Sequence, residues 1–409
     1  MTILLRILPL FLLYAAVPVF RAGDAPDGRE QKEIARALEE LREVSGLRAK
    51  KPLRHEMIRR DQVGVFLKKR VKESVDPEQI RAEEITLKKF GLVPPDFNLE
   101  KSTVDLLTEQ AAAFYDYKKR KLYLMEGSPA DLSEMALVHE VSHALADQNF
   151  NLARFIKNAG PSDDSALARI AVMEGQASWL AGEVLARRRG QSLVTNKPLF
   201  EMLSGANEVS TAGFPILQSV PLYLRETLMF PYTRGLRFQH ALYEKDKQSA
   251  FARVFTSPPV TTQQILHPEK YFEQAGPTRP ELPELPRRRG YKTIAEGMVG
   301  ELDHTILLQE YVSRETALEV APHWTGGRYR LLERKPRTVL SYAVSWDSPE
   351  IASRYFGLYR KILEKKWKRF QVARETPGLL EGEGDDGHFE TRLEGSVVSS
   401  IEGMGAPNP

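Results

Sequence analysis

Residues 137–150 read LVHEVSHALADQNF, and residues 139–143 within them form the motif HExxH. If this stretch is a helix, His139 and His143 lie one turn apart on the same face, so both imidazoles can reach one metal ion. Glu140 projects about 100° away from His139 around the helix and can hold a water molecule beside that metal. The stretch therefore predicts a metal-binding helix. Core histidines bonded to backbone carbonyls are the alternative interpretation.

The surroundings of the motif favour a metal site over core histidines. Ser128, Pro129 and Asp131 fit the N-cap, N1 and N3 positions of a helix that runs to about Asn149. A helix that is apolar nearly all round is buried, and ionisable side chains inside it need partners. The apolar residues of this helix are Leu132, Met135, Ala136, Leu137, Val138, Val141, Ala144 and Leu145.

A third ligand is predicted on the next helix, which spans about residues 165–189. One face of that helix is apolar or small except for Glu174. An unpaired buried carboxylate would be costly, and a metal ion or a strong cation would offset that cost. Gly175 and Ala177 are small enough to let two helices approach closely, as a shared metal requires. Glu174 is therefore the candidate third ligand, and an ion pair to an arginine is the alternative.

The spacing of these residues resembles that of a known family. HExxH is followed, 31 residues after His143, by Glu174 in the string EGQA, which is similar to the gluzincin metallopeptidases. The resemblance implies zinc as the cofactor, a glutamate on the second helix as its third protein ligand, and a mostly helical zincin-like domain. The corresponding ligands here are His139, His143 and Glu174, and Glu140 is the base that activates water.

Two further segments fit the same resemblance. Residues 110–116 and 121–125 predict a β-hairpin just ahead of the motif helix. In gluzincins an edge strand at this place binds extended substrate by β-addition. Residues 230–238, FPYTRGLRF, are similar to the PYxxG segment of aminopeptidases of the leukotriene-hydrolase type. That likeness assigns Tyr232 to the stabilisation of the tetrahedral oxyanion, and a core tyrosine is the alternative.

A closer likeness is to a family of prokaryotic envelope proteins that carries HExxHALxDQ, EGxA, PYxxG and PPxxTxQILHPEKY in this order. It covers residues 105–275, and Ser142 stands where threonine is expected. His267 lies in the last string and is either a second oxyanion donor or a brace for its loop, of which we favour the brace. Asp147 either orients a ligand histidine through its second nitrogen or is a helix-end aspartate.

Composition excludes several kinds of protein. The chain has 409 residues, a formal net charge of +3 and no cysteine. Disulfides, thiolate nucleophiles and cysteine-held metals are therefore excluded, so any metal must be bound by histidines and carboxylates. The near balance of 58 basic and 55 acidic residues gives no nucleic-acid footprint.

The N-terminal segment predicts export. Arg6 precedes an apolar run over residues 7–20, which is typical of a signal peptide or an N-terminal anchor over residues 1–22. We therefore expect the protein to be periplasmic, secreted or anchored on the outer face of the cytoplasmic membrane, with residues 1–22 as the membrane tether in the last case. The sequence indicates no oligomeric state.

The rest of the chain predicts an α+β protein in several parts. A helical region, residues 23–100, is either a removable propeptide or part of the fold. The C-terminal part should place two helices on a small antiparallel sheet, with residues 301–319 as one helix and residues 380–387 as a solvated loop. The expected parts are the helical region 23–100, the gluzincin-like catalytic domain 101–278, the proline-rich linker 279–290 and the α+β domain 291–403.

These observations predict zinc-dependent hydrolysis of peptide bonds in a peptide or protein substrate, in the cell envelope or outside the cell. The alternative is a non-catalytic, metallopeptidase-like scaffold that binds a partner in the envelope. A third interpretation is a di-iron carboxylate protein, because Glu140 with His143 and Glu301 with His304 form two Glu-x-x-His pairs.

Overall fold

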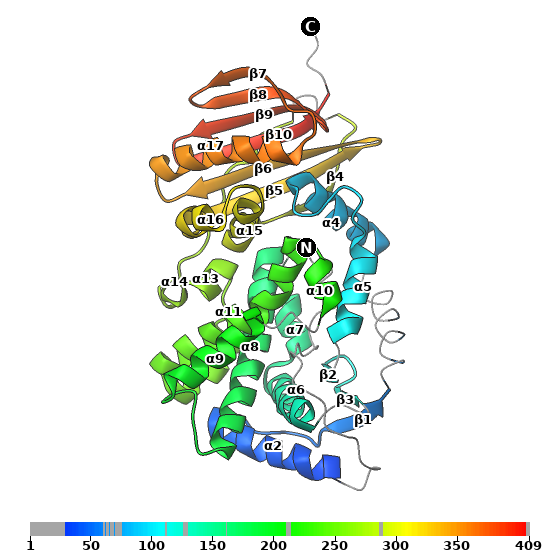
Figure 1. Cartoon of the computed structure of the whole chain (residues 1–409), viewed down its shortest axis with the longest axis vertical. Helices are drawn as coiled ribbons and strands as arrows, with labels where there is room; N and C mark the ends of the chain where they lie inside the picture. The colour runs from blue at the N-terminus through cyan, green and yellow to red at the C-terminus, as the bar shows by residue number, and fades with distance from the viewer. Residues whose placement is uncertain are drawn as a thin grey trace.

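The computed structural model describes residues 29–59, 76–110, 113–125, 130–160, 162–209, 214–285 and 289–405, together with positions 62, 65 and 69. Its architecture is mixed α+β: a helical part is followed by a separate antiparallel sheet (Figure 1). This confirms the predicted fold class at that level. The predicted signal segment, and Ser128 and Pro129 at the start of the motif helix, lie outside the described residues.

Three long helices form the centre of the helical part. They are α6 (Ala130–Phe150), α8 (Asp163–Arg188) and α11 (Leu222–Asp246), and α8 packs against both of the others. The two helices predicted around residues 139 and 174 are thus confirmed. The helices around them are α2 (Arg29–Ser45), α4 (Pro77–Phe90), α5 (Leu99–Gln110), α7 (Leu152–Lys157), α9 (Lys197–Val209), α10 (Pro215–Ser219), α12 (Ala250–Thr256), α13 (Thr262–Leu266) and α14 (Pro268–Phe272).

The predicted hairpin is confirmed and belongs to a three-stranded sheet beside α6. Strands β2 (Ala113–Asp116) and β3 (Lys121–Met125) pair antiparallel, with Asp116 opposite Lys121. A strand that was not predicted, β1 (Arg54–Ile58), pairs parallel with β3 on its other side. The expectation that residues 23–100 form a helical region is therefore wrong at β1. The sheet order β1-β3-β2 leaves β2 as the edge strand nearest α6.

The C-terminal sheet is larger than predicted, because it has seven strands in the order β4-β5-β6-β10-β9-β8-β7. Helix α17 (Pro349–Lys366) lies across one face of it (Figure 1). The strands are β4 (Lys292–Gly297), β5 (Trp324–Arg334), β6 (Arg337–Trp346), β7 (Gln371–Thr376), β8 (Leu379–Gly384), β9 (Gly387–Glu394) and β10 (Val397–Met404).

The expected solvated loop at residues 380–387 is instead strand β8 and its turn into β9. Buried positions alternate along β8, and two of them are the glycines Gly382 and Gly384. A Cβ on Gly384 would lie 2.4 Å from the ring of Trp367, so glycine is required for the ring to pack on the strand. Glycine is depleted in strands, and for this reason the sequence pattern did not predict strand β8.

The single helix expected over residues 301–319 is also wrong. The structure has α15 (Glu301–Tyr311) and α16 (Arg314–Val320), and the chain breaks between them at Val312 and Ser313. Ser313 has extended backbone, and its hydroxyl accepts a hydrogen bond from the amide of Thr316. It is therefore an N-cap that starts a second helix.

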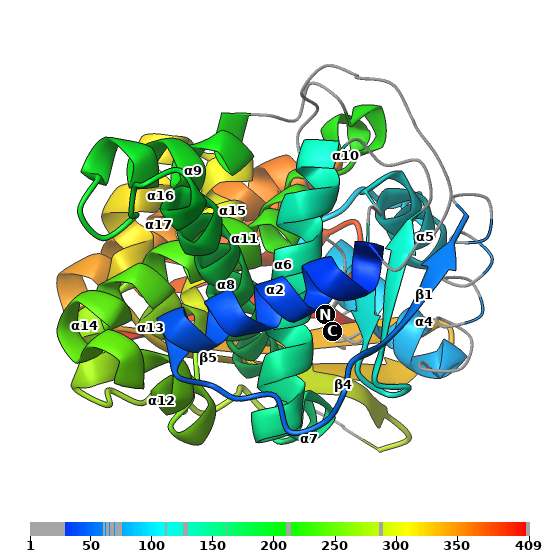
Figure 2. The same cartoon turned by 90° about the horizontal axis from the view of Figure 1, so that it is seen from below.

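The N-terminal region contributes to both parts of the structure, which favours its being part of the fold. Helix α2 lies across α6 and α8 (Figure 2) and buries Ile34, Ala37, Leu41 and Val44. Helix α4 packs against β4 of the C-terminal sheet. The loop after α4 is attached as well, because the Tyr311 hydroxyl donates a 2.7 Å hydrogen bond to the carbonyl of Gly91.

Residues 279–285 of the proline-rich segment are not a free linker. Leu285 is buried against Leu332, Val339 and Ile401 of the C-terminal sheet. The hydroxyl of Ser341 on β6 donates a 2.8 Å hydrogen bond to the carbonyl of Pro283. The segment therefore packs on the sheet, on which its apolar side chain completes a small second core.

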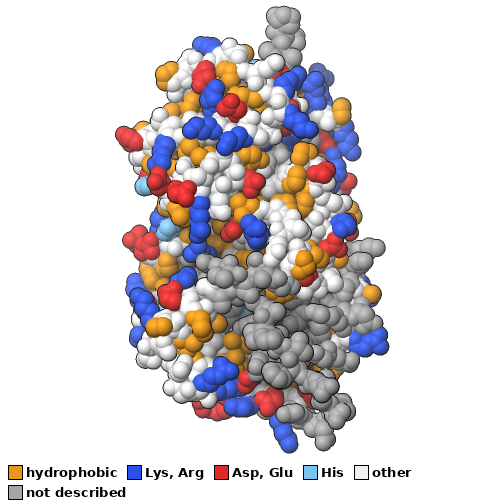
Figure 3. Space-filling view, viewed as in Figure 1, with side chains coloured by type: hydrophobic (Ala, Val, Ile, Leu, Met, Phe, Trp, Pro, Cys, Tyr) orange, Lys and Arg blue, Asp and Glu red, His pale blue; other side chains and the backbone are white. Residues whose placement is uncertain are grey.

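The surface agrees with the balanced composition. On the face seen in Figure 3, basic and acidic side chains are interspersed over the described residues. None of the helices in the described ranges combines the length and the apolar composition that crossing a bilayer requires.

Candidate metal centre

Helices α6 and α8 bring three ligand atoms together. The Nε2 atoms of His139 and His143 lie 3.0 Å apart, and Oε2 of Glu174 lies 3.1 Å from the first and 3.2 Å from the second. A carboxylate oxygen of Glu140 lies within 4.8 Å of the two histidine ligand atoms. The four residues predicted to form the core of the site are therefore in one place, supplied by two helices.

These separations fit a tetrahedral metal ion. Ligand atoms at about 2.0–2.1 Å from such an ion lie about 3.3 Å from one another, close to the three separations seen here. Two imidazole nitrogens and one carboxylate oxygen are also the donor set that zinc takes in catalytic sites, with one position left for water. Oε2 of Glu174 lies within hydrogen-bond distance of both nitrogens, whereas no oxygen of Glu140 has a hydrogen-bond partner among the described residues, which favours Glu174 as the third ligand.

Burial and charge place these groups in the protonation states that metal binding needs. His139 is 1% exposed, and burial lowers the pKa of its imidazole to about 4. Burial opposes ionisation of Glu174, but His143 and His139 nevertheless lower the pKa of its carboxyl to about 2. A neutral imidazole and an ionised carboxylate therefore face each other at neutral pH. Metal ligands must be in these deprotonated forms.

Two buried carboxylates at the site have unused oxygen atoms. Three oxygens have no hydrogen-bond partner among the described residues: both oxygens of Glu140, and Oε1 of Glu174. Burial and the charge of Glu174 raise the pKa of Glu140 well above its usual value. The backbone amide of Tyr115 lies near this carboxyl and offsets a small part of that rise. Buried oxygens without partners at a convergent donor set fit a bound cation and its water.

Helix α11 brings Tyr232 to the same place. The Tyr232 ring stacks on the His139 ring at a centroid distance of 6.4 Å. Burial, the charges of Glu174 and Glu140, and a hydrogen bond to Glu174 raise the pKa of the phenol well above its usual value. The hydroxyl of Tyr232 is therefore a neutral hydrogen-bond donor beside the ligands.

A close crossing of α8 and α11 sets the position of Tyr232. A Cβ on Gly175 would lie 2.1 Å from the carbonyl carbon of Gly235, and one on Gly235 would lie 2.2 Å from the carbonyl oxygen of Ala171. The sequence predicts that Gly175 allows the approach of the two helices that carry His139 and Glu174. It instead allows the approach of α11, and so connects the EGQA and PYTRG strings.

Replacing Gly235 by alanine should therefore destabilise the protein, by about 1–3 kcal/mol or more, because the added carbon overpacks backbone against backbone. Helix propensity alone predicts the opposite sign, a gain of about 1 kcal/mol. Urea unfolding measures the difference. Gly357→Ala is the matched control, since Gly357 lies in α17 with open space around it, and it should be neutral or stabilising. Equal effects of the two substitutions would contradict the crossing.

Asp147 does not contact a ligand histidine among the described residues. Its Oδ2 accepts a 2.9 Å hydrogen bond from the Tyr115 hydroxyl, and its Oδ1 accepts one of 2.9 Å from the amide of Leu152. Arg120 in the hairpin turn pairs with it at 3.6 Å. The helix-end alternative therefore holds, and Asp147 attaches β2 and the start of α7 to the end of α6.

Sequence reasoning missed the next residue, Gln148. Its Oε1 accepts hydrogen bonds from the amides of Lys50 and Lys51, at 2.6 and 2.9 Å, and its Nε2 donates to the carbonyl of Lys51 at 3.0 Å. The neighbouring Asn149 donates to the carbonyl of Arg48 at 3.1 Å. These amides hold the segment between α2 and β1 against the motif helix. The only sequence signal was an amide side chain beside Asp147 in the HALADQ string.

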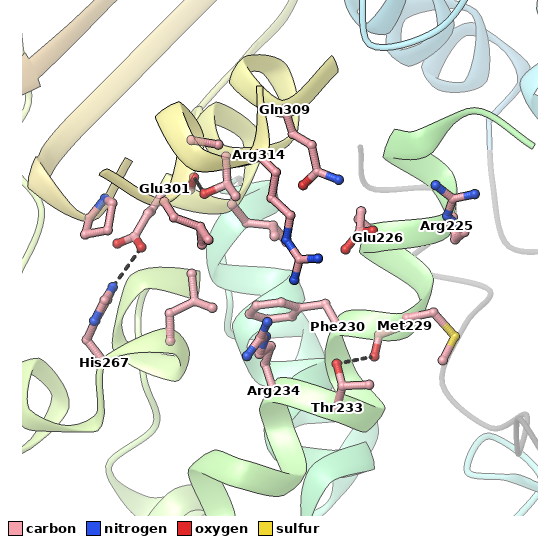
Figure 4. Close-up of a pocket in the computed structure, with 16 residues that line it drawn as sticks. Arg225, Glu226, Met229, Phe230, Thr233, Arg234, His267, Glu301, Gln309 and Arg314 are labelled. Atoms are coloured by element: carbon pink, nitrogen blue, oxygen red, sulfur yellow. Dashed lines mark hydrogen bonds and ion pairs between the residues drawn. The ribbon is translucent and has the colours of Figure 1, made fainter. Parts of the chain in front are cut away.

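His267 braces the junction between the helical part and α15. Its Nε2 lies 2.7 Å from Oε1 of Glu301 (Figure 4), and its Nδ1 lies 3.6 Å from Glu269. The favoured interpretation of His267 as a brace agrees with these contacts. They also speak against the di-iron interpretation, because Glu301, one of its proposed ligands, is bonded to His267. Both ring nitrogens of His304 are engaged as well, by the carbonyl of Gly300 and the Tyr342 hydroxyl.

No family model, curated protein or solved structure matches this chain. The gluzincin resemblance therefore rests on the motif residues and on the site geometry described above.

Proposed function

We propose that this protein is a zinc metallopeptidase of the gluzincin type that cleaves peptide or protein substrates in the cell envelope or outside the cell. The observation that carries the proposal is the convergence of His139, His143 and Glu174 within 3.0–3.2 Å of one another. Glu140, buried beside them without a partner in the described residues, supplies the base. The proposed location outside the cytoplasm rests on the sequence of residues 1–22 alone.

Each proposed role follows from the chemistry of the side chain. Bound zinc would polarise the scissile carbonyl and lower the pKa of a water molecule toward about 7. Glu140 accepts the proton of the attacking water and gives it to the leaving amine. The neutral Tyr232 hydroxyl donates to the carbonyl oxygen as negative charge develops there. The edge of β2 that pairs with no other described strand, with the Tyr115 amide near Glu140, is the proposed place for extended substrate.

Metal analysis combined with a proteolysis assay tests the proposal. The purified full chain should contain about one zinc per chain and cleave peptides from a mixed-sequence library, detected by mass spectrometry. A chelator should abolish cleavage, and added zinc should restore it. Two irons per chain would contradict the proposal in favour of a di-iron protein. One zinc with no cleavage of any library peptide would favour the non-catalytic scaffold.

Tyr232→Phe tests the oxyanion role. We expect kcat to fall by about 10²-fold, with zinc content and KM nearly unchanged, because the hydroxyl bonds the carbonyl oxygen only as charge develops. The phenyl ring preserves the packing against His139. Steady-state kinetics, metal analysis and melting temperature on one preparation separate this from a core role. A lower melting temperature with unchanged kcat would identify Tyr232 as a core tyrosine.

A further inference from the structure

A cavity of about 700 Å³ lies between α11 and the helices α15 and α16 (Figure 4). Its floor is the face of α11 that carries Met229, Phe230 and Thr233. At about 100° per residue, the centre of that face lies roughly 105° around α11 from Tyr232. The cavity and the metal centre therefore occupy different sides of one helix. Its volume falls within the range of small-molecule sites, about 300–1,000 Å³.

The cavity has cationic groups in its lining. Arg314 at the start of α16 and Arg234 on α11 extend toward the Phe230 ring, whereas Arg225 points away from it (Figure 4). Arg314 forms no ion pair or side-chain hydrogen bond with any residue in the described ranges, and it is exposed. A guanidinium offers donors in a planar fork that matches a carboxylate. Arg314 thus has no bonded partner among the described residues, and its charge reaches only the adjacent Glu315, whose pKa it helps to lower.

The opposite charges in the lining are fewer and already engaged. Glu301 pairs through Oε1 with His267 at one end of the cavity, and Glu226 and the cation Arg234 each have an interaction of their own. Three arginines against two glutamates leave one net positive charge in the lining. An anionic ligand would neutralise it.

The lining also has an apolar side that solvent reaches. Leu318, one turn after Arg314 on α16, is 60% exposed. Met229, Phe230 and Leu266 line the cavity as well. An apolar group seated here would cover Leu318, and burial of apolar surface stabilises a complex.

We propose that this cavity binds a carboxylate that carries an apolar group, with the carboxylate on Arg314 and the apolar group against Phe230 and Leu318. Two kinds of molecule offer this chemistry: the C-terminal residue of a peptide and a fatty acid. The proposal does not depend on the peptidase function, because the cavity shares no residue with the metal centre.

Calorimetric titration of the full chain with three probes tests the charge requirement. The probes are N-acetyl-phenylalanyl-leucine as the free acid, the same compound as its C-terminal amide, and octanoate. We expect the free acid or octanoate to bind, and the amide to bind at least about tenfold more weakly than the acid, because only a carboxylate pairs with Arg314. Tighter binding of the peptide acid would assign the site to peptide termini, and tighter binding of octanoate to fatty acids. Equal binding of acid and amide would overturn the proposal.

Substitution of Arg314 tests the location. Arg314→Gln should weaken binding of the carboxylate by about tenfold or more. Arg374→Gln is the matched control, since it removes the same charge from an exposed position on β7, at the far edge of the sheet, and should leave Kd unchanged. Both residues are exposed, so both variants should fold. A carboxylate held by the metal centre would bind the Arg314→Gln protein as tightly as the unaltered protein, and that result would overturn the assignment.

Discussion

Glu140→Gln should lower kcat for peptide hydrolysis by about 10²–10⁴-fold, the contribution typical of a positioned general base, while zinc content and fold are retained. Glutamine has nearly the size of glutamate but cannot accept the proton of the attacking water. Folding should not suffer, because the substitution removes a fully buried carboxyl whose two oxygens have no partner among the described residues. Burying a neutral amide costs less than burying a charge.

The measurement is kcat on a peptide identified in the library assay, alongside metal analysis and the melting temperature of the same preparation. Zinc-dependent cleavage at the unaltered rate would show that Glu140 is not the base. Loss of zinc from this variant would show instead that Glu140 is a ligand, which its position within 4.8 Å of the two histidine ligand atoms makes a specific alternative.

Glu174→Gln should have the opposite outcome, with loss of zinc as the primary defect. The same chemical change is made here at a carboxylate 3.1 and 3.2 Å from the two imidazole nitrogens. Removing the anionic ligand leaves two neutral imidazoles, and we expect zinc affinity to fall by more than about 10²-fold, since changes to outer partners of a site alone cost 10–100-fold.

Zinc affinity is measured by competition with a chromophoric chelator, which requires no enzymatic activity. The two variants control for each other, because both replace a buried glutamate of one site by glutamine. Unaltered zinc affinity in the Glu174→Gln protein would show that another residue is the third ligand. If both variants keep zinc and activity, the proposed centre is wrong altogether.

The N-terminal region bears on how the protein is processed. Gln148 of the motif helix holds the segment at Lys50 and Lys51, and α2 buries four apolar side chains in the helical core. Removing a propeptide that includes these residues would expose that core to water. The contacts therefore favour an N-terminal region that stays with the helical part.

Local patterns in the sequence determined much of the candidate site. The i, i+4 spacing of His139 and His143 depends only on helix geometry, and the lone carboxylate of Glu174 on an apolar face indicated its partner helix. The hairpin ahead of α6 followed from two short runs joined by a polar turn. All of these signals lie within one element, where periodicity decides which side chains share a face.

Only the tertiary structure decided which side chains of different helices and strands contact one another. Tyr232 reaches His139 and Glu174 because Gly175 and Gly235, 60 residues apart in the chain, let α8 and α11 touch backbone to backbone. His267 and Asp147 took bracing roles because Glu301 and Tyr115 lie beside them in space. Strand β8 contains glycine, against the local preference, because the Trp367 ring packs on Gly384 and the backbone of Gln371 lies against Gly382. Periodicity along a chain records which face of an element is buried, but it does not record which distant surface that face will meet.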